Sequence, residues 1–347
     1  MKIDLFTHRY PPDPGGIERH VQELARFLQR QKHDVTVHAT RWKSGQLWRE
    51  VDNGINVYRH RAIAPNEGYY ISPQVAIQSL RSSADLIHAH GYHALPFLFA
   101  VLGSKNKPTV VTPHYNGKGG NQLRQFLHRI YRPVAGIGLK KADGVISVSE
   151  WEKQKLCQNF GTESAVIRNG IDVQKFSNTS QYKWPNPYLL SIGRLEKSKG
   201  VQHIIRSLPK LPEYDLLIAG DGQYKERLEQ LASRSEVDDR VHFLGHVDSD
   251  VPALYAGAEA HIFLSEYECF GLTAGESLAS GTPCVVRDVT ALSEWTDYTG
   301  CIGVDSVNPD AVAGAIKRAI GMSTNRDEIQ TWEEMGQKVL DIYSKLV

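Results

Sequence analysis

The stretch that decides the fold is SEYECFGLTAGESLASGTPCVV, residues 265–286. Two carboxylates, Glu268 and Glu276, stand eight residues apart in it, and the glycine turn at residues 270–271 follows the first. If a helix begins near Leu272, Glu268 lies in the loop before it and Glu276 about one turn inside it. Both acids then meet at a helix N-terminus, where free N–H groups and the dipole favour an anionic or hydroxyl-rich ligand. A diphosphate carrying a sugar would suit this end, although acids near helix starts are also common as simple dipole partners.

The chain has 347 residues, which is enough for two domains of ordinary size, each with its own core. Its four cysteines lack paired or metal-type spacing, so we expect free thiols in a reducing compartment. They are Cys157, Cys269, Cys284 and Cys301. Met1 leads directly into an expected strand, which predicts no signal peptide, and the longest apolar run, residues 95–102, is too short to span a bilayer. We therefore expect a cytoplasmic protein.

The formal net charge of +1 conceals an asymmetry between the two halves. Residues 1–170 contain 23 Lys and Arg against 13 Asp and Glu, a net charge of +10, whereas residues 171–347 contain 17 against 26, a net charge of −9. The N-terminal half should attract an anionic partner, such as a membrane surface or a phosphorylated substrate. Nucleic acid is not expected, because the basic residues form no recognisable reading motif.

Basic residues crowd residues 105–141, and part of this segment has the pattern of an amphipathic helix. Apolar Leu123, Phe126, Leu127, Ile130 and Tyr131 interleave there with Arg124, His128, Arg129 and Arg132. A second basic and aromatic cluster consists of Arg41, Trp42, Lys43, Trp48 and Arg49. The helix could lie on an anionic membrane as a peripheral contact, or its apolar face could pack inward with the charges merely solvated. The pattern leaves both alternatives open.

The N-terminal half begins with a strand, a Pro- and Gly-rich loop and a helix. The expected strand is residues 2–7, the loop ends in Gly15 and Gly16, and the helix covers residues 18–30. Glycines let a backbone approach a ligand closely at a helix N-terminus, which is the geometry that cradles phosphate. Further strands are expected at residues 35–39, 55–60, 86–90, 109–112 and 145–148. Strands separated by helical stretches indicate a parallel sheet, with ligands beyond its carboxyl ends.

Histidines stand at two of these strand ends. His114 follows residues 109–112 in a loop, so we expect it to contact the substrate. His88 and His90 could indicate a metal by their spacing, but no nearby Cys or carboxylate completes a site, and a structural role is favoured.

The C-terminal half starts a second parallel sheet. A strand at residues 188–193 is followed by Arg194 and Lys199 and then by a helix at residues 201–208. Two cations at the carboxyl end of a strand, beside a helix N-terminus, suit a diphosphate. Later strands are expected at residues 216–219, 241–245 and 260–264, and a closing helix at residues 332–346.

Two sheets, one in each half, predict an α/β protein with two Rossmann-like domains that face each other across a cleft. We expect an N-terminal acceptor-side domain at residues 1–170, a nucleotide-sugar-binding domain at residues 171–330 and a closing helix at residues 331–347 that packs back on the first domain. Residues 172–187 are polar and are the best interdomain linker.

Taken in their order along the chain, these motifs resemble those of the retaining GT-B glycosyltransferases of the GT4-type family. The resemblance covers the chain nearly from end to end. The matching segments are residues 15–20, 112–114, 148–150, 169–172, 193–200 and 219–222, and above all the pair Glu268 and Glu276. The resemblance implies a hexosyltransferase that moves a sugar from a nucleotide-diphosphate sugar to a hydroxyl acceptor. We expect that acceptor to be a lipid-linked or membrane-associated glycan intermediate.

The resemblance also implies roles for individual residues. Arg194 and Lys199 would neutralise the donor diphosphate, Glu276 would hold the ribose, and Glu268 would grip the sugar, which His114 would also reach. The donor-binding residues implied in this way are Gly16, Arg194, Lys199, Gly245, His246, Val247, Phe270, Gly271, Leu272 and Glu276. The catalytic residues implied are Glu268, His114, Arg194 and Lys199.

The chemistry expected of such a site is governed by charge. Breaking a sugar–phosphate bond builds negative charge on the leaving diphosphate, which fixed cations can stabilise without a divalent metal or other cofactor. The family's retention is pictured as a front-face reaction, in which the departing phosphate takes the acceptor proton, and no glycosidase-type pair of carboxylates is then needed. A sugar-nucleotide epimerase of the same fold and a non-catalytic nucleotide- or glycan-binding module remain alternatives. Cys269, Tyr115, Gly275, Ser277, Thr290 and Ala291 depart from the family pattern, which bears on the donor sugar more than on the reaction class.

Overall fold

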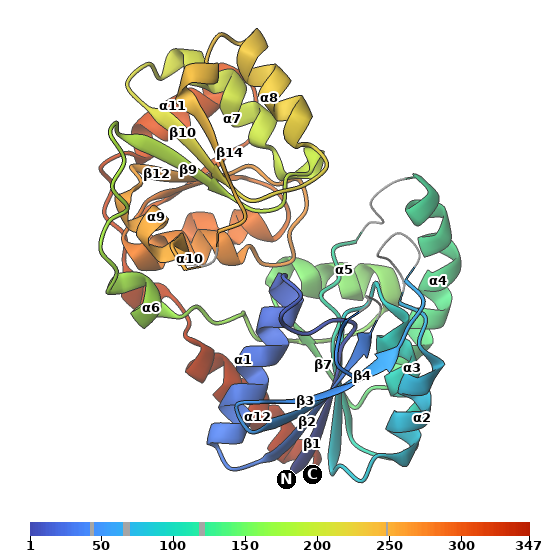
Figure 1. Ribbon diagram of the computed structural model, residues 1–347. Helices are drawn as coiled ribbons and strands as arrows, with labels where there is room; N and C mark the ends of the chain where they lie inside the picture. Colours follow the sequence, from blue (N-terminus) through green and yellow to red (C-terminus); the bar gives the residue numbers. More distant parts are fainter. Residues whose placement is uncertain (42–44, 65–69, 118–121, 248) are drawn as a thin grey trace. The chain divides into compact units, whose positions relative to one another are not determined.

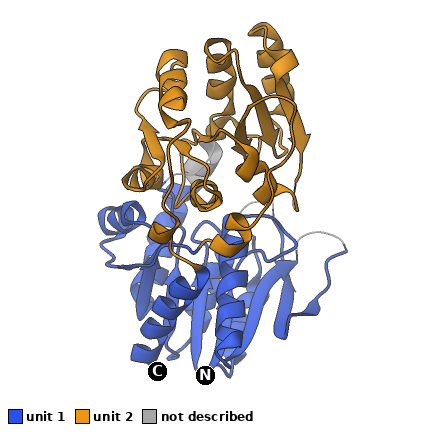
Figure 2. Cartoon of the chain, turned by 90° about the vertical axis from the view of Figure 1, so that its left-hand side faces the viewer, with its two compact units in different colours: residues 1–170, 332–347 blue, residues 171–331 orange. Residues whose placement is uncertain are grey.

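The computed structural model describes residues 1–41, 45–64, 70–117, 122–247 and 249–347. For residues 122–127 it describes the backbone but not the side chains. The chain divides into two compact units (Figure 2). Unit 1 consists of Met1–Gly170 and Trp332–Val347, and unit 2 consists of Ile171–Thr331. Among the described residues, no helix is long and apolar enough to cross a membrane.

Unit 1 contains an eight-stranded sheet with the order β3-β4-β2-β1-β5-β6-β7-β8. Its strands are β1 (Lys2–Phe6), β2 (Asp34–Arg41), β3 (Arg49–Asp52), β4 (Ile55–Arg61), β5 (Leu86–His90), β6 (Thr109–Thr112), β7 (Gly144–Ser147) and β8 (Ala165–Val166). All neighbouring pairs are parallel except β3 and β4, which form an antiparallel hairpin. Asn53 and Gly54 turn this hairpin with φ of 49° and 87°, values typical of a tight two-residue turn.

Helices cover both faces of this sheet. They are α1 (Gly16–Arg30), α2 (Pro73–Arg81), α3 (Leu95–Gly103), α4 (Gln122–Lys141), α5 (Glu150–Phe160) and α12 (Trp332–Leu346). Helices α1 and α12 lie on one face and α2 and α3 on the other (Figure 1). The five residues of β5 are all buried, as expected for a central strand with helices on both sides.

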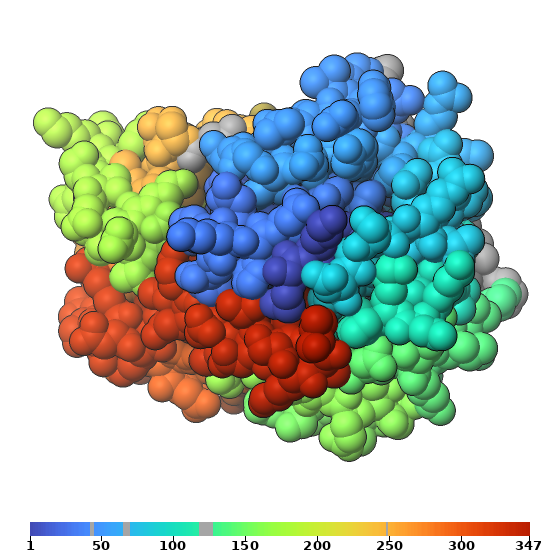
Figure 3. Space-filling view, turned by 90° about the horizontal axis from the view of Figure 1, so that it is seen from below, coloured from blue at the N-terminus to red at the C-terminus, as the bar shows by residue number. Residues whose placement is uncertain are grey.

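The last helix of the chain belongs to the first unit. Helix α12 runs beside α1 at the base of unit 1, and Figure 3 shows the end of the chain against its beginning. Gly336 allows this contact, because a Cβ there would meet the ring of Phe27 at 2.3–2.8 Å. Tyr343 adds a polar anchor, since its hydroxyl lies 2.6 Å from Nδ1 of the buried His88.

Unit 2 contains a six-stranded parallel sheet with the order β11-β10-β9-β12-β13-β14. Its strands are β9 (Tyr188–Ile192), β10 (Asp215–Ala219), β11 (Val241–Gly245), β12 (Ala260–Phe263), β13 (Cys284–Arg287) and β14 (Cys301–Val304). Its α-helices are α6 (Val173–Ser177), α7 (Val201–Ser207), α8 (Lys225–Arg234), α9 (Val251–Gly257), α10 (Leu272–Ser280) and α11 (Pro309–Ala319). Helices α7, α8 and α11 lie on one face of the sheet, and α9 and α10 on the other (Figure 1).

The predicted fold class, two α/β domains built on parallel sheets, is confirmed. The helix expected to begin near Leu272 begins at that residue. The prediction that residues 172–187 form a linker is wrong in its first part, because residues 173–177 form helix α6 within unit 2. Phe176 of α6 is 2 % exposed and packs against the ring of Tyr255, so this segment contributes to the core.

Candidate functional site

Unit 2 brings a lysine and a glutamate together at the carboxyl ends of two adjacent strands. Strands β9 and β12 are neighbours, Lys199 lies in a 3-10 turn after β9, and Glu268 lies in the loop after β12. The Nζ of Lys199 is 2.6 Å from Oε1 of Glu268, and the two side chains are 20 % and 17 % exposed. A half-buried pair at this distance is a strong, charge-assisted hydrogen bond. Lys199 and Glu268, both predicted from the sequence, therefore form one ion pair.

Arg194 is arranged differently from Lys199. Its side chain is 70 % exposed, and its Nη1 is 2.8 Å from Oε1 of Glu196. Arg194 and Lys199 nevertheless line the same small pocket at the end of β9. The other residues of that pocket are Ser191, Ile192, Gly193, Leu195, Val201, Ile218 and Phe263. The pocket presents one half-buried and one exposed cation.

The loop before α10 has the conformation that its glycine predicts. Gly271 has φ of 91°, and a Cβ there would meet Leu292 at 2.6 Å, so glycine is needed for both backbone and space. The indole N–H of Trp295 donates to the carbonyl of Phe270 at 2.7 Å and fixes this loop. Sequence reasoning missed Trp295, because it lies 25 positions away in a 3-10 segment (Thr290–Asp297).

Glu276 lies on α10 and is 5 % exposed. The hydroxyl of Tyr255 donates to its Oε2 at 3.4 Å. Glycine at position 275 also has a structural reason, since a Cβ would meet Trp295 at 2.6 Å and Ile171 at 2.9 Å. Close packing thus explains this departure from the family pattern.

The segment predicted to meet the base follows β11. Gly245 ends that strand with φ of 70°, and its carbonyl accepts the N–H of Gly220 at 2.7 Å. His246 and Val247 continue the loop next to the turn that follows β10.

In unit 1, the predicted histidine stands in an unusual backbone conformation. His114 follows β6, is 6 % exposed and has φ of 50°, a left-handed conformation that costs a non-glycine residue about 1 kcal/mol or more. The backbone N–H groups of Tyr115 and Val148 both donate to the carboxylate of Glu152 on α5. Glu152 therefore holds the chain at the position next to His114.

Glu152 does not complete a capping box at the start of α5, and its pKa is shifted. The hydroxyl of Ser149 caps α5 by accepting the N–H of Glu152 at 3.1 Å, but Glu152 reaches Val148 and Tyr115 instead of the Ser149 N–H that a capping box requires. Burial raises the pKa of Glu152 to about 7, although its two backbone donors act in the opposite direction.

Gly16 is the first residue of α1, and the loop before it is closed by an ion pair. The Nε of Arg9 is 2.7 Å from Oε1 of Glu18, whose side chain is 3 % exposed. A Cβ on Gly15 would collide with this carboxylate, so the glycine is required for the pair to form. Burial raises the pKa of the Glu18 carboxyl above its usual range, and Arg9 opposes that shift.

Comparison with known proteins settles the family. Residues 14–175 match the family model Glycosyltransferase Family 4, and residues 173–338 match Glycosyl transferases group 1. The glycogen synthase of Mycobacterium tuberculosis (strain H37Rv) is 31% identical to this chain, and the match covers 90% of this chain and 84% of that protein. The chain belongs to the GT4-type glycosyltransferases. The phosphatidyl-myo-inositol mannosyltransferase of Mycolicibacterium smegmatis is 28% identical, with 84% of this chain and 77% of that protein covered.

Solved structures agree in fold with this GT4-type chain. The sucrose-phosphate synthase of Thermosynechococcus elongatus superposes with a TM-score of 0.84 at 21% identity, covering 99% of this chain and 98% of the other. HepE from Anabaena, in complex with UDP-glucose, gives 0.80 at 20% identity, with both chains fully covered. At these identities the likeness establishes the fold, and the chain is a GT-B glycosyltransferase.

This glycosyltransferase has a basic pocket in unit 1 that sequence reasoning did not predict. A cavity of about 530 Å³ lies between strands β2 and β4 and helix α2. Its lining includes four arginines, two histidines and two aromatic residues: Arg41, Arg59, Arg61, Arg81, His38, His60, Trp48 and Tyr58. Glu50 pairs with Arg59 at 2.7 Å, whereas no ion pair within the described residues involves the other three arginines. Only Arg41 and Trp48 belong to the basic cluster predicted from sequence, because the others are spread over separate elements.

Helix α4 was expected to be amphipathic, and its described half carries an apolar stripe on the outside. Ile130, Val134 and Ile137 are 60 %, 45 % and 60 % exposed, at helical spacing of four and three residues. Tyr131, expected on the same face as Ile130, is instead half-buried against the core. Arg129, Arg132, Lys140 and Lys141 are exposed on the same helix. Leu123, Arg124, Phe126 and Leu127 of the prediction lie outside the described side chains, as do Trp42 and Lys43 of the second cluster.

Proposed function

We propose that this glycosyltransferase transfers a hexose, with retention of anomeric configuration, from a nucleoside diphosphate sugar to a hydroxyl of a membrane-associated acceptor. The observation that carries the proposal is the Lys199–Glu268 pair at the ends of β9 and β12. It lies in the loops that precede α7 and α10, and α10 carries the buried Glu276. Cations and helix N-termini at the carboxyl ends of parallel strands suit a diphosphate.

We assign the donor-binding residues their roles according to their charge. Lys199 and Arg194 neutralise the diphosphate as it leaves, Glu276 binds the ribose hydroxyls, and Glu268 orients both Lys199 and the sugar. His114 of unit 1 contacts the sugar. HepE, which has the same fold, binds UDP-glucose, and this supports a nucleotide sugar as the donor class.

We assign no metal to the leaving-group step. The negative charge that develops on the diphosphate meets Lys199, which Glu268 holds in place, and the exposed Arg194 of the same pocket. A preorganised cation such as Lys199 lowers a barrier without reorganising during the reaction. The departing phosphate oxygen takes the acceptor proton on the same face of the sugar. To Glu268, which pairs with Lys199, we assign the orientation of that lysine and not the role of a nucleophile.

The acceptor proposal depends on two features of unit 1. The basic pocket suits an acidic group, because Arg41, Arg61 and Arg81 surround it alongside aromatic surfaces on which a sugar can stack. The exposed apolar stripe of α4, flanked by basic residues, suits the surface of an anionic membrane. The relative named phosphatidyl-myo-inositol mannosyltransferase supports a lipid acceptor class.

The test compares two lysines of the same 3-10 turn, Lys197–Lys199. Lys199→Ala should lower kcat/KM for sugar transfer by about 10²–10³, since it removes a charge that stabilises the leaving group. Lys197→Ala removes the same charge from an exposed position and should keep near wild-type activity. Donors are first selected by thermal shift across UDP-, GDP- and ADP-sugars, because a ligand of the native state raises its stability.

Three outcomes would contradict the proposal. Equal activity of the two lysine variants would remove the charge role of Lys199. Inversion of the anomeric centre, read from the product by NMR, would remove the retaining mechanism. Conversion of the donor sugar in the absence of any acceptor would instead identify an epimerase.

A further inference from the structure

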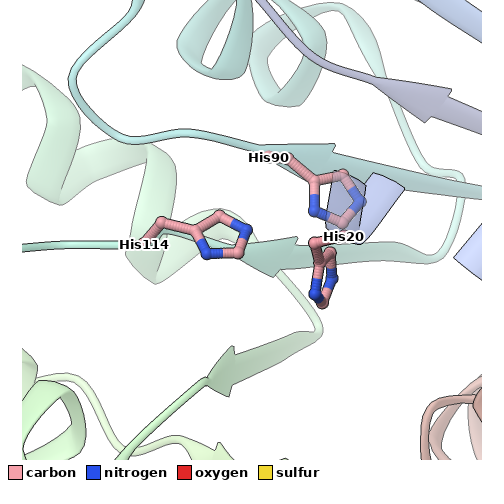
Figure 4. Close-up of side chains that lie close together, drawn as sticks. All are labelled: His20, His90 and His114. Carbon is pink, nitrogen blue, oxygen red and sulfur yellow. The ribbon is translucent and has the colours of Figure 1, made fainter. Parts of the chain in front are cut away.

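Three imidazoles from separate elements of unit 1 converge on one point. His20 lies on α1, His90 ends β5, and His114 follows β6 (Figure 4). One ring nitrogen from each histidine lies within 4.8 Å of the others. The ring centroids are 5.3 Å apart for His20 and His90, 4.9 Å for His20 and His114, and 6.0 Å for His90 and His114.

Four ring nitrogens of this cluster are buried without hydrogen-bond partners among the described residues. His20, His90 and His114 are 1 %, 0 % and 6 % exposed. Within the described residues, Nε2 of His20, both nitrogens of His90 and Nε2 of His114 have no partner. A buried polar atom in this state costs about 1–3 kcal/mol, so four of them in one place need an explanation.

The neighbouring His88 shows what a structural histidine looks like in this core. Its Nδ1 is 2.6 Å from the hydroxyl of Tyr343, and its Nε2 is 2.8 Å from Oγ1 of Thr112. Both nitrogens are satisfied by protein groups. The three clustered histidines differ from it in this respect.

Asn169 sets the orientation of His20. Its amide oxygen lies 2.8 Å from Nδ1 of His20, both groups being buried. An amide oxygen only accepts, so Nδ1 carries the proton and Nε2 presents a lone pair to the cluster. This is the arrangement by which outer groups orient metal-binding histidines.

The three rings are also in the protonation state that binds metals. Burial lowers the pKa of His20 to about 4, although its hydrogen bond to Asn169 acts in the opposite direction. Burial, and then the neighbouring imidazoles, lower the pKa values of His90 and His114 well below their usual range. Neutral imidazoles without a carboxylate among them suit zinc and the neighbouring transition metals, and do not suit magnesium or calcium.

We propose that His20, His90 and His114 bind one divalent transition-metal ion, with Zn²⁺ as the type ion. Three histidines leave a fourth position of a tetrahedral ion for water or another ligand. Because Zn–N bonds are about 2.0–2.1 Å long, nitrogens separated by as much as 4.8 Å would have to move closer together in the loaded form. The ion would join the N-terminal helix to the ends of two central strands.

The consequence for activity rests on the proposed function. His114 is assigned to the donor sugar, and a nitrogen bound to a metal is no longer available to that sugar. The ion is therefore an inhibitor of transfer that acts in unit 1, separate from the metal-free chemistry at Lys199.

The test uses full-length protein without a polyhistidine tag, stripped with a chelator and titrated with Zn²⁺ by calorimetry and with Co²⁺ by visible absorption. Wild-type protein should bind one ion, give the visible bands of tetrahedral cobalt and melt at a higher temperature with Zn²⁺. His20→Gln and His90→Gln should each weaken binding by at least tenfold, and Asn169→Ala should weaken it about 10–100-fold through the lost orientation of His20.

The matched control is His261→Gln in unit 2. His261 is buried with an unpartnered Nε2, but it belongs to no such cluster among the described residues, so its loss should leave binding unchanged. Melting curves of the metal-free variants show whether they fold.

The proposal is overturned if wild-type protein binds no ion stoichiometrically, whether or not the variants fold. It is equally overturned if the His20 and His90 variants bind as tightly as wild type. Stoichiometric binding that leaves transfer uninhibited contradicts the assignment of His114 to the sugar, and the metal site stands.

Discussion

At the scale of single residues, the candidate site depends on side chains that hold other residues in position. Lys199 and Glu268 could be predicted from sequence, because charged residues after buried strands meet at one edge of a parallel sheet. Glu152 could not be assigned its role, since its partner Tyr115 lies 37 positions away and the contact exists only in the folded chain. His20 was missed for the same reason, because the histidines that lie close to His90 come from α1 and from the loop after β6.

Glu152 also makes a prediction about pH. Its pKa is about 7 in the folded protein, against about 4.5 in the unfolded chain, so the folded state holds a proton that the unfolded state has lost between these values. The free energy of unfolding contributed by this group must then fall as pH rises from 4.5 to 7, by about 3 kcal/mol at most. Glu152→Gln should abolish this contribution. Urea unfolding at pH 5, 6 and 7 should show the wild type losing stability relative to the variant, and parallel curves would contradict the shift.

At the scale of elements, Trp295 connects a 3-10 segment to the start of α10. Trp295→Phe keeps an aromatic ring in the packing and removes only the N–H that binds the Phe270 carbonyl. We expect a loss of about 1 kcal/mol in the free energy of unfolding and a several-fold higher KM for the donor, because the loop before the helix is released. Trp184→Phe is the control, because it removes an indole N–H that donates to Asp215 at 2.8 Å, at the start of β10, and it should lower stability similarly without changing the donor KM. An unchanged donor KM in Trp295→Phe would show that the loop is held by other contacts.

Helix α4 makes a second prediction at this scale. The double variant Ile130→Gln and Ile137→Gln removes apolar area only from the outside of the helix, so the fold should persist. Co-sedimentation with anionic vesicles at low salt should fall by tenfold or more, since each side chain contributes roughly 1.5 kcal/mol or more when buried. Ile63→Gln, an exposed isoleucine outside α4, is the control. Equal binding of both variants would exclude this helix as the membrane contact.

Some helices and strands could not be predicted, because their apolar and polar residues do not follow the period of a helix or of a strand. Helix α3 is apolar on nearly every side, and a segment buried all round gives no helical alternation of apolar and polar residues. Strand β3 has the sequence Arg-Glu-Val-Asp on the edge of the sheet, where little burial constrains it. The strands at the centre of each sheet were predictable because burial on both faces requires continuous apolar runs.

At the scale of the whole molecule, the buried histidines are distributed unevenly between the units. In unit 1, burial lowers the pKa of His8 to about 3 and that of His20 to about 4, and His88, His90 and His114 are also lowered. Their stability contribution is complete above pH 6.5 and is lost as pH falls, because the unfolded chain takes up protons that the folded unit rejects. Below pH 6.5, His8 and His20 alone lower the free energy of unfolding by about 2.7 kcal/mol for each unit by which the pH falls.

Unit 1 should therefore open before unit 2 on acidification. Hydrogen exchange followed by mass spectrometry between pH 7 and pH 5, corrected for intrinsic rates, should show protection lost first in β5 and β6 and retained in β9 and β12. In unit 2 the buried His261 is the comparable group in the described part, with its pKa lowered to about 3. Simultaneous loss of protection in both units would contradict the prediction.

The return of α12 to unit 1 has a consequence for biosynthesis. Synthesis from the N-terminus completes the sequence of unit 2 before it reaches α12, whose Gly336 fits against Phe27 and whose Tyr343 contacts His88. The nascent first unit therefore keeps one side of α1 uncovered until the whole of unit 2 has been synthesised. A chaperone that binds exposed apolar helices would find its substrate during that interval.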